Sequence, residues 1–307
     1  RLQILIDARQ HGLEYITRKL DKDSKLSSIV DNIRSLDIEN TKLKISLCRE
    51  ALELIDKKLM LKLWAEVQGE LANALLTQGF GLPADIESQE EAITIYESIL
   101  QEGIEETLPD VWLSTQRNLG YAFVRRTKGD KSINLERGRN HLLKCQAKAT
   151  ASSDKVELAM AIASTYLEQA DGNKDYLSLA ESQLVLAIRI YDSVGDNVGK
   201  AVAELMLGNA QCSFQTEKRR MSTESIVTMR NAIEELSKSK ATLELIVGAR
   251  TLATCLLHEN DNISRTYVLE AIGFLESIRA SLITDQFQLA LEQLDTELRN
   301  LKRHFAA

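Results

Sequence analysis

Apolar residues recur along the chain in a fixed frame with helical spacing. A large apolar residue is followed by small residues one and three positions later, and usually by a bulky residue at position four. These offsets fall on one face of an α-helix, and the small pair lets a neighbouring helix approach closely. The large residues of the successive copies, 43 to 48 positions apart, are Leu71, Leu119, Ile162, Leu207 and Leu252.

A second apolar frame alternates with the first. Its clearest copies are the strings AITIYESI and AIRIYDSV, which begin at Ala92 and Ala187. Apolar residues at i, i+1, i+4 and i+7 again form one helical stripe. Polar segments rich in Gly, Asn and Asp separate the two frames, and these residue types end one helix and cap the next. Those segments lie at 79–85, 128–134, 171–175 and 258–262. The pattern therefore predicts repeated helix hairpins.

The hairpins account for most of the chain, and the two ends differ from them. We predict N-terminal capping helices over residues 1–60, where Ile4, Leu5, Leu13, Ile16 and Leu20 indicate a helix that packs on the first repeat. Five hairpins are predicted over residues 61–280, at about 61–102, 110–150, 154–195, 198–238 and 241–280. Residues 281–307 are predicted to form a C-terminal capping helix whose inward leucines are Leu289, Leu291, Leu294, Leu298 and Leu301. A hairpin cannot bury its apolar face alone, so stacked repeats need atypical ends.

Composition narrows the class further. Two prolines and an aromatic share of 5% favour helices over a β-sandwich or barrel. A net charge of −7 disfavours binding to nucleic acid or to an anionic membrane. The four cysteines form no CxxC pair and no apolar run is long enough to span a bilayer, so we expect a protein of the reducing cytoplasm. The chain begins at Arg1, which leaves open that it is part of a longer protein.

Residues 64–150 carry a more specific pattern. In one ungapped alignment Trp64, Gln68, Leu71, Ala72 and Ala74 match Trp112, Gln116, Leu119, Gly120 and Ala122. The frame resembles the tetratricopeptide repeat, although the usual repeat has about 34 residues. The stretch DVWLSTQRNLGYAFVRRTKGDKSINLERG resembles a long-loop subfamily, which occurs in bacterial arrays that often precede a caspase-like CHAT protease domain. The resemblance implies a right-handed superhelical array that senses or positions a partner.

The same resemblance implies a concave groove lined by the first helix of each hairpin. Carried onto this register, the candidate residues for partner binding are Asn73, Arg117, Tyr121, Arg125, Asn209 and Arg250, with Glu66, Glu157, Ser164 and Thr254 in the same set. Arginine offers a planar fork of donors, and asparagine offers a donor and an acceptor, so both can hold a peptide. A solvated helix face explains these residues nearly as well.

No catalytic constellation emerges from the sequence. His141 and Cys145 lie one turn apart on a predicted helix, which provides half of a zinc site and no oxyanion site. The clusters Lys218-Arg219-Arg220 and Arg125-Arg126 with Lys128 are explained by solvated loops. We therefore expect a protein that is not an enzyme, has no cofactor and binds a partner protein or peptide. The alternative is a regulator that senses a small ligand or peptide, and the oligomeric state stays open.

Overall fold

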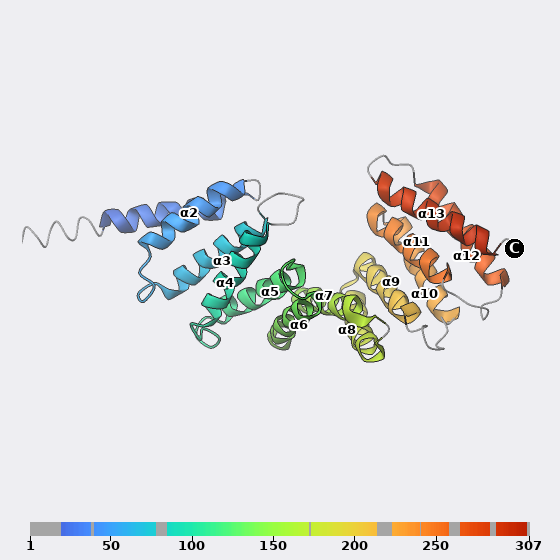
Figure 1. Ribbon diagram of the computed structural model, residues 1–307, viewed down its shortest axis with the longest axis horizontal. Helices are drawn as coiled ribbons and strands as arrows, with labels where there is room; N and C mark the ends of the chain where they lie inside the picture. Colours follow the sequence, from blue (N-terminus) through green and yellow to red (C-terminus); the bar gives the residue numbers. More distant parts are fainter. Residues whose placement is uncertain are drawn as a thin grey trace, which may run out of the picture. The chain divides into compact units, whose positions relative to one another are not determined.

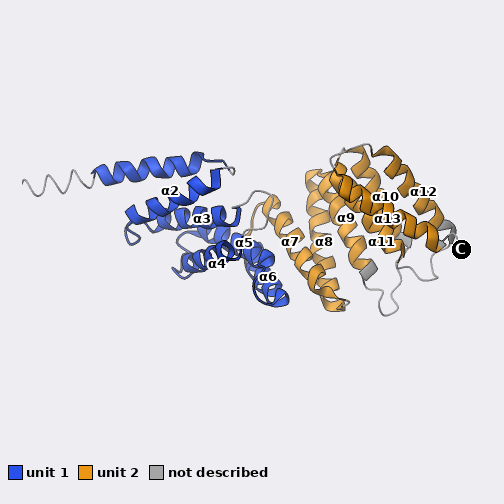
Figure 2. Cartoon of the chain, turned by 45° about the horizontal axis from the view of Figure 1, so that its top comes forward, with its two compact units in different colours: residues 1–148 blue, residues 149–307 orange. Residues whose placement is uncertain are grey.

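A computed structural model of the chain describes residues 20–37, 40–77, 85–171, 173–213, 223–239, 241–257, 265–282 and 287–305. Helices joined by turns and short loops account for all of these residues, as Figure 1 shows, so the predicted all-α class is confirmed. The chain divides into two compact units, residues 1–148 and residues 149–307, which are coloured separately in Figure 2.

The first unit is a series of helices that pack on their neighbours in sequence. Its first described helix covers residues 20–35. It is followed by α2 (Thr41–Leu54), α3 (Leu61–Thr77), α4 (Ile86–Leu100), α5 (Pro109–Arg125) and α6 (Lys131–Lys148). From α2 to α6 each helix contacts the next, and α3 also contacts α5. This order of contacts is that of stacked helix hairpins.

The second unit repeats the arrangement. It contains α7 (Ser152–Ala170), α8 (Lys174–Val194), α9 (Asn197–Ser213), α10 (Thr223–Lys238), α11 (Thr242–Leu257), α12 (Arg265–Ser281) and α13 (Gln288–Phe305). Consecutive helices again contact each other. In addition, α9 contacts α11, and α11 contacts α13. Of the helices that carry the first frame, α9 and α11 therefore stack beside each other, and α13 takes the next place in that row.

The helix ends follow from local side-chain chemistry. The carboxylate of Asp85 accepts a hydrogen bond from the Ser88 amide at 2.9 Å and caps α4. Pro109 opens α5, where its missing N–H costs nothing. Asn173 caps α8 through the amides of the following turn. The sequence favoured Gly or Asn at the left-handed helix ends, yet α7 ends at Asp171, whose φ is 35°.

The first apolar frame forms the buried face of its helices. The large residue is fully buried in α5, α7 and α11, and the small residues beside it are buried in every copy. The exceptions fall in α9, where Leu207 and Gln211 are only half-buried. Gln211 is polar at this position, and it accepts a hydrogen bond from Ser225 of α10.

The second frame is buried more fully in one copy than in the other. In α4 every apolar position is buried: Ala92, Ile93, Tyr96 and Ile99. In α8 Ala187 is buried, Ile188 and Tyr191 are half-buried, and Val194 is 59% exposed. The expectation of one continuous buried stripe is therefore wrong for α8, since Val194 is its last residue and lies beyond the packed turns.

The C-terminal helix α13 corrects another expectation. Leu291, Leu294, Leu298 and Leu301 are buried, whereas Leu289 is 70% exposed. Residues two positions apart point about 200° apart on an α-helix, so Leu289 and Leu291 cannot share one face. The polar residues on the outer side of α13 include Arg299 and Lys302.

Several expectations lie outside the described residues. They include the helix expected around Ile4 to Ile16, most of the loops at 79–85 and 258–262, and the basic cluster Lys218-Arg219-Arg220.

The buried frame can be tested at Leu119, which has no exposed surface in α5. We predict that Leu119→Ala lowers the free energy of unfolding of the first unit by about 2–5 kcal/mol, because it leaves a cavity between packed helices. Both tryptophans of the chain, Trp64 and Trp112, lie in this unit, so urea unfolding followed by tryptophan fluorescence reports it selectively. Leu59→Ala is the control, since Leu59 is 78% exposed. Equal unfolding midpoints for both variants would show that the assigned register is wrong.

Candidate functional site

A groove lies between α9 and α11, the first helices of two successive hairpins in the second unit. Its volume is about 350 Å³. This cavity is hereafter called the α9–α11 groove. It is lined by Val202, Leu205, Met206, Asn209, Leu243, Glu244, Val247, Gly248 and Thr251. Both helices contribute residues from successive turns, so the cavity runs along the helices as a groove.

Close approach of the two helices forms the floor of the groove. A Cβ atom added to Gly248 would lie 2.5 Å from Cδ1 of Leu205. Any larger residue at this position would push the Leu205 side chain aside. Gly248 therefore keeps the floor shallow and apolar, with Leu205 buried beneath it.

The walls of the groove are apolar and partly open to water. Leu243 and Val247 on α11 are 45% and 47% exposed, and Val202 and Met206 on α9 are half-buried. Leu243, Val247 and Thr251 are spaced by four residues, which places them in one row on α11. Apolar side chains gathered in a groove and left exposed are typical of an interaction site.

The polar groups of the groove lie among these apolar walls. Asn209 and Thr251 contribute an amide and a hydroxyl, and the Thr251 hydroxyl donates to the Val247 carbonyl at 2.9 Å. Among the described residues that line the groove, Glu244 is the only charged one, and it is exposed. The groove therefore combines an apolar surface with a single negative charge.

Of the six residues predicted to bind a partner, the groove includes only Asn209. Arg250 is half-buried on α11 outside the groove lining, and its buried Nε has no hydrogen-bond partner among the described residues. The other four, Asn73, Arg117, Tyr121 and Arg125, belong to the first unit.

In the first unit Asn73 joins three helices. Its Oδ1 accepts hydrogen bonds from the Tyr96 hydroxyl at 2.5 Å and from the Asn118 amide nitrogen at 2.9 Å. These contacts connect α3 with α4 and α5, and burial raises the pKa of Tyr96 far above its ordinary value. Asn73 therefore helps to hold the stack together. Arg117 and Tyr121 are half-buried on α5, whereas Arg125 at its end is exposed.

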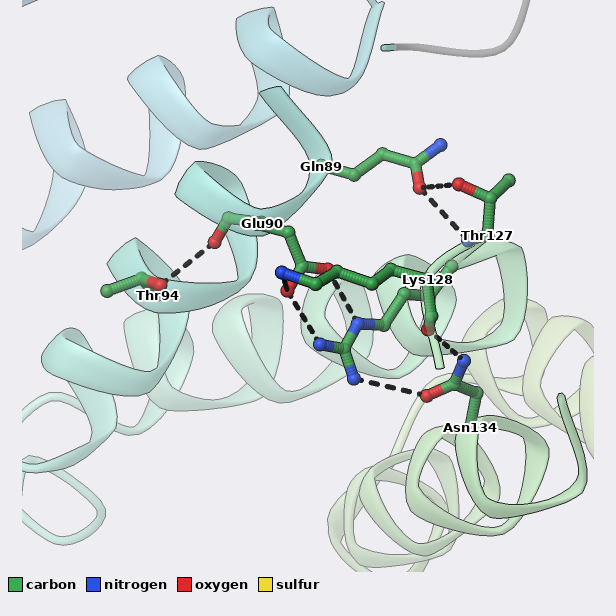
Figure 3. Close-up of polar contacts among 7 residues, drawn as sticks. Gln89, Glu90, Thr94, Thr127, Lys128 and Asn134 are labelled. Carbon is green, nitrogen blue, oxygen red and sulfur yellow. Dashed lines mark hydrogen bonds and ion pairs between the residues drawn. The ribbon is translucent and has the colours of Figure 1, made fainter. Parts of the chain in front are cut away.

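A second network involves Arg126, Lys128 and Asn134, which belong to the quoted stretch at residues 110–138 (Figure 3). Arg126 donates two hydrogen bonds of 2.6 Å to the Glu90 carboxylate of α4 and one of 3.2 Å to Oδ1 of Asn134 on α6. The Asn134 amide donates to the Lys128 carbonyl at 2.9 Å. The hydrogen bonds from Arg126 hold the pKa of Glu90 below its usual value. A bidentate pair of this kind fixes geometry, so the network fastens one hairpin to the next.

Two further residues of this loop complete the pattern. Asp130 accepts a hydrogen bond from the Ile133 amide at 2.9 Å and so caps α6. Gly129 adopts a φ of 85°, which a residue with a side chain rarely does. On α4, Gln89 accepts from the amide and the hydroxyl of Thr127 at 3.1 and 3.0 Å (Figure 3).

His141 and Cys145 each have a structural partner on α5. Nδ1 of His141 lies 2.6 Å from Oε1 of Gln116, and the ring stacks on Phe123 with a centroid distance of 5.8 Å. The Cys145 thiol is buried and lies 3.6 Å from the Leu113 carbonyl oxygen. These contacts fasten α6 to α5.

A second cavity, of about 310 Å³, lies in the first unit between the helix at 20–35 and the start of α3. Its lining mixes apolar residues such as Leu26 and Leu63 with Asp23, Asp31 and Arg34. Arg34 also approaches Glu66 of α3 at 3.5 Å. This cavity is more charged than the α9–α11 groove, and its arginine already has a carboxylate partner.

The predicted set used the position five residues before the large residue only at Glu66 and Glu157, so it missed most residues of the α9–α11 groove. Five residues before the large position stand Val202 in α9 and Val247 in α11, and one residue before it stands Met206. The corresponding positions in α3 and α5 are Glu66, Glu70, Ser114 and Asn118. This change from polar to apolar residues at equivalent positions was the signal that could have located the groove.

No group of three or more His, Cys, Asp and Glu side chains among the described residues could hold a metal ion. None of their helices is long and apolar enough to cross a membrane.

The fold places the described chain in the class of all-α arrays of packed helix hairpins. No family model and no curated protein matches the chain. A solved structure from the computational design of self-assembling cyclic protein homo-oligomers is 10% identical and covers 94% of both chains, with a TM-score of 0.19. A likeness this distant carries no argument about this protein.

His141 leads to a prediction about pH. Burial, with Lys144 and Arg137 nearby, lowers the pKa of His141 to about 4. Below about pH 6.5, the ordinary value for histidine, the unfolded chain takes up a proton that the folded chain does not, so stability falls with falling pH. We predict that between pH 7 and pH 5 the wild type loses about 1–2 kcal/mol more than His141→Phe.

The measurement is urea unfolding at both pH values, followed by the fluorescence of Trp64 and Trp112. Each protein is compared with itself at pH 7, so any constant cost of the substitution cancels. The same pH dependence in both proteins would show that His141 titrates normally in the folded state.

Proposed function

We propose that the chain is a protein-interaction array of the tetratricopeptide type, which holds a partner protein or peptide and performs no chemistry itself. The observation that carries this proposal is the α9–α11 groove, where Leu243 and Val247 stay exposed on a packed array. Single apolar residues such as Leu59 and Leu289 are also exposed elsewhere, but here several apolar residues line one groove, which is typical of a surface that a partner covers.

The residues of the long-loop pattern maintain the stack, which leaves recognition to other positions of the repeat. Trp112 is buried with the Lys148 ammonium 4.9 Å from its ring centre, Gln116 pairs with His141, and Arg126 pairs with Glu90. All three residues thus maintain the stack. Recognition is then left to the positions that vary between repeats, and the α9–α11 groove occupies such positions.

The finer part of the proposal concerns the biological setting. The pattern in residues 64–150 resembles arrays that precede caspase-like CHAT protease domains in bacteria. We propose that this chain is a regulatory or scaffolding array of such a cytoplasmic signalling system. In this role the array would restrain or position an effector by holding a segment of it.

A small-ligand sensor is the second candidate, and the groove volume favours it to some extent. A cavity of about 350 Å³ lies at the lower end of the range for small-molecule sites. Such sites usually bury most of the ligand surface. The exposure of Leu243 and Val247 describes an open groove, which a chain segment covers better than a small molecule does.

The proposal is tested by affinity capture from cells of the native host, with mass spectrometry to identify the proteins retained. The baits are the wild type, Val247→Glu, the pair Arg117→Glu/Arg125→Glu, and Val227→Glu as the control. Val227 lies on α10 and is 40% exposed, so it matches Val247 in residue type and approximate exposure. Circular dichroism confirms that each bait is folded.

We expect a protein that the wild type and Val227→Glu retain and that Val247→Glu loses, because a buried carboxylate opposes apolar contact. Loss with the arginine pair instead would place recognition in the first unit. An identical set of proteins on all four baits, or none on any, would contradict an array that binds through its first helices.

A further inference from the structure

The chemistry of the α9–α11 groove specifies the kind of segment that it can accept. Its floor and walls come from Val202, Leu205, Met206, Leu243 and Val247, which offer only methyl, methylene and thioether groups. Such a surface recognises an aliphatic or methionine side chain by burial alone. Methionine in the wall also adapts to side chains of different shapes.

The charge in the groove restricts what stands beside that side chain. Glu244 lines the groove next to Leu243, and none of the described residues that line the groove is a lysine, arginine or histidine. Among the described residues Glu244 has no salt bridge or side-chain hydrogen bond. A carboxylate at the edge of an apolar groove favours a cation and repels an anion. Most of the net charge of −7 lies in residues 149–307, which adds to this preference.

The dimensions of the groove limit the length of the segment. The row from Leu243 to Thr251 covers eight helical steps, or about 12 Å. An extended chain covers the same distance in about four residues. Asn209 and Thr251 make the far end of the groove polar.

We propose that the α9–α11 groove binds a short peptide segment that inserts a Leu, Ile or Met side chain between Met206 and Val247 and places a Lys or Arg side chain beside Glu244. This inference rests on the proposed function and adds the chemistry of the partner. The proposed preference excludes acidic segments, because a second carboxylate would lie beside Glu244 with no cation among the described residues of the groove lining.

The test uses selection from a phage library of random 12-residue peptides, with the full chain as bait. We expect the selected peptides to carry an aliphatic or methionine residue within two positions of a lysine or arginine. The most enriched peptide is then synthesised with a fluorescent label, and its dissociation constant is measured by fluorescence anisotropy. Val247→Glu should weaken binding at least about tenfold, as at the centre of an interface, and Val227→Glu should leave it unchanged.

Glu244→Lys tests the electrostatic part of the proposal. This variant should bind the basic peptide about fivefold more weakly and should select acidic peptides from the same library. Wild-type binding should also weaken at high salt, because the pair lies at an exposed edge. Selected peptides without a basic residue, or an affinity insensitive to Glu244→Lys, would overturn the proposed preference.

The remaining outcomes separate this inference from the function on which it rests. Peptides that bind Val247→Glu as well as the wild type but fail to bind Arg117→Glu would overturn the groove and leave a peptide-binding array in place. Failure to select any peptide would count against both proposals. Sedimentation velocity tests whether a second copy of the chain occupies the groove instead of a peptide. A wild-type dimer that Val247→Glu converts to a monomer would show that it does and would overturn the proposal.

Discussion

The close contact between helix backbones is the constraint on which the stack depends. In the hairpin of α5 and α6, a Cβ atom added to Gly138 would lie 2.7 Å from the carbonyl oxygen of Gly120, which is too short for any real contact. A Cβ atom on Gly120 would lie 2.8 Å from Leu142, which is fully buried. Only glycine fits this crossing without displacement of the backbone. The small residues of the first frame serve the same purpose in the other hairpins: alanine is sufficient in α3, α7 and α11, whereas in α9 a Cβ atom added to Gly208 would clash with Cγ of Met229. Because each helix approaches its neighbour so closely, the polar network of Arg126 can bridge consecutive hairpins.

This constraint divides the repeat into two sets of positions. The buried face is held to large and small apolar residues, and its polar companions, such as Asn73, Gln116 and Arg126, connect helices. The outward positions of the first helices are free to change. The positions five residues and one residue before the large residue are polar in α3 and α5, whereas Val202, Met206 and Val247 take three of the four equivalent places in α9 and α11 and line the groove. A partner can therefore be specified without disturbing the stack.

The sequence was sufficient for the helical class and for the buried frame, because both depend on local periodicity. It failed where position along a helix matters: Leu289 and Val194 were assigned to buried stripes, although one lies off the buried face and the other at a helix end. The hydrogen-bond networks of the side chains could not be predicted from the sequence either. Asn73 fitted the pattern of a binding residue, but its bonds to Tyr96 and Asn118 depend on contacts between three helices, which spacing alone does not reveal. The groove was missed because the candidate residues were all polar side chains, whereas most of the groove lining is apolar.

The most direct test of this account is a comparison of two glycine substitutions in the first unit. Gly138 lies at the close contact between α5 and α6, whereas nothing lies within 4 Å of a Cβ atom added to Gly69 in the middle of α3. Urea unfolding followed by the fluorescence of Trp64 and Trp112 measures both variants. The account predicts that Gly138→Ala lowers the free energy of unfolding by about 1–3 kcal/mol through overpacking, and that Gly69→Ala raises it by up to about 1 kcal/mol through helix propensity. Equal effects of the two substitutions would contradict the claim that backbone contact between helices governs the stack.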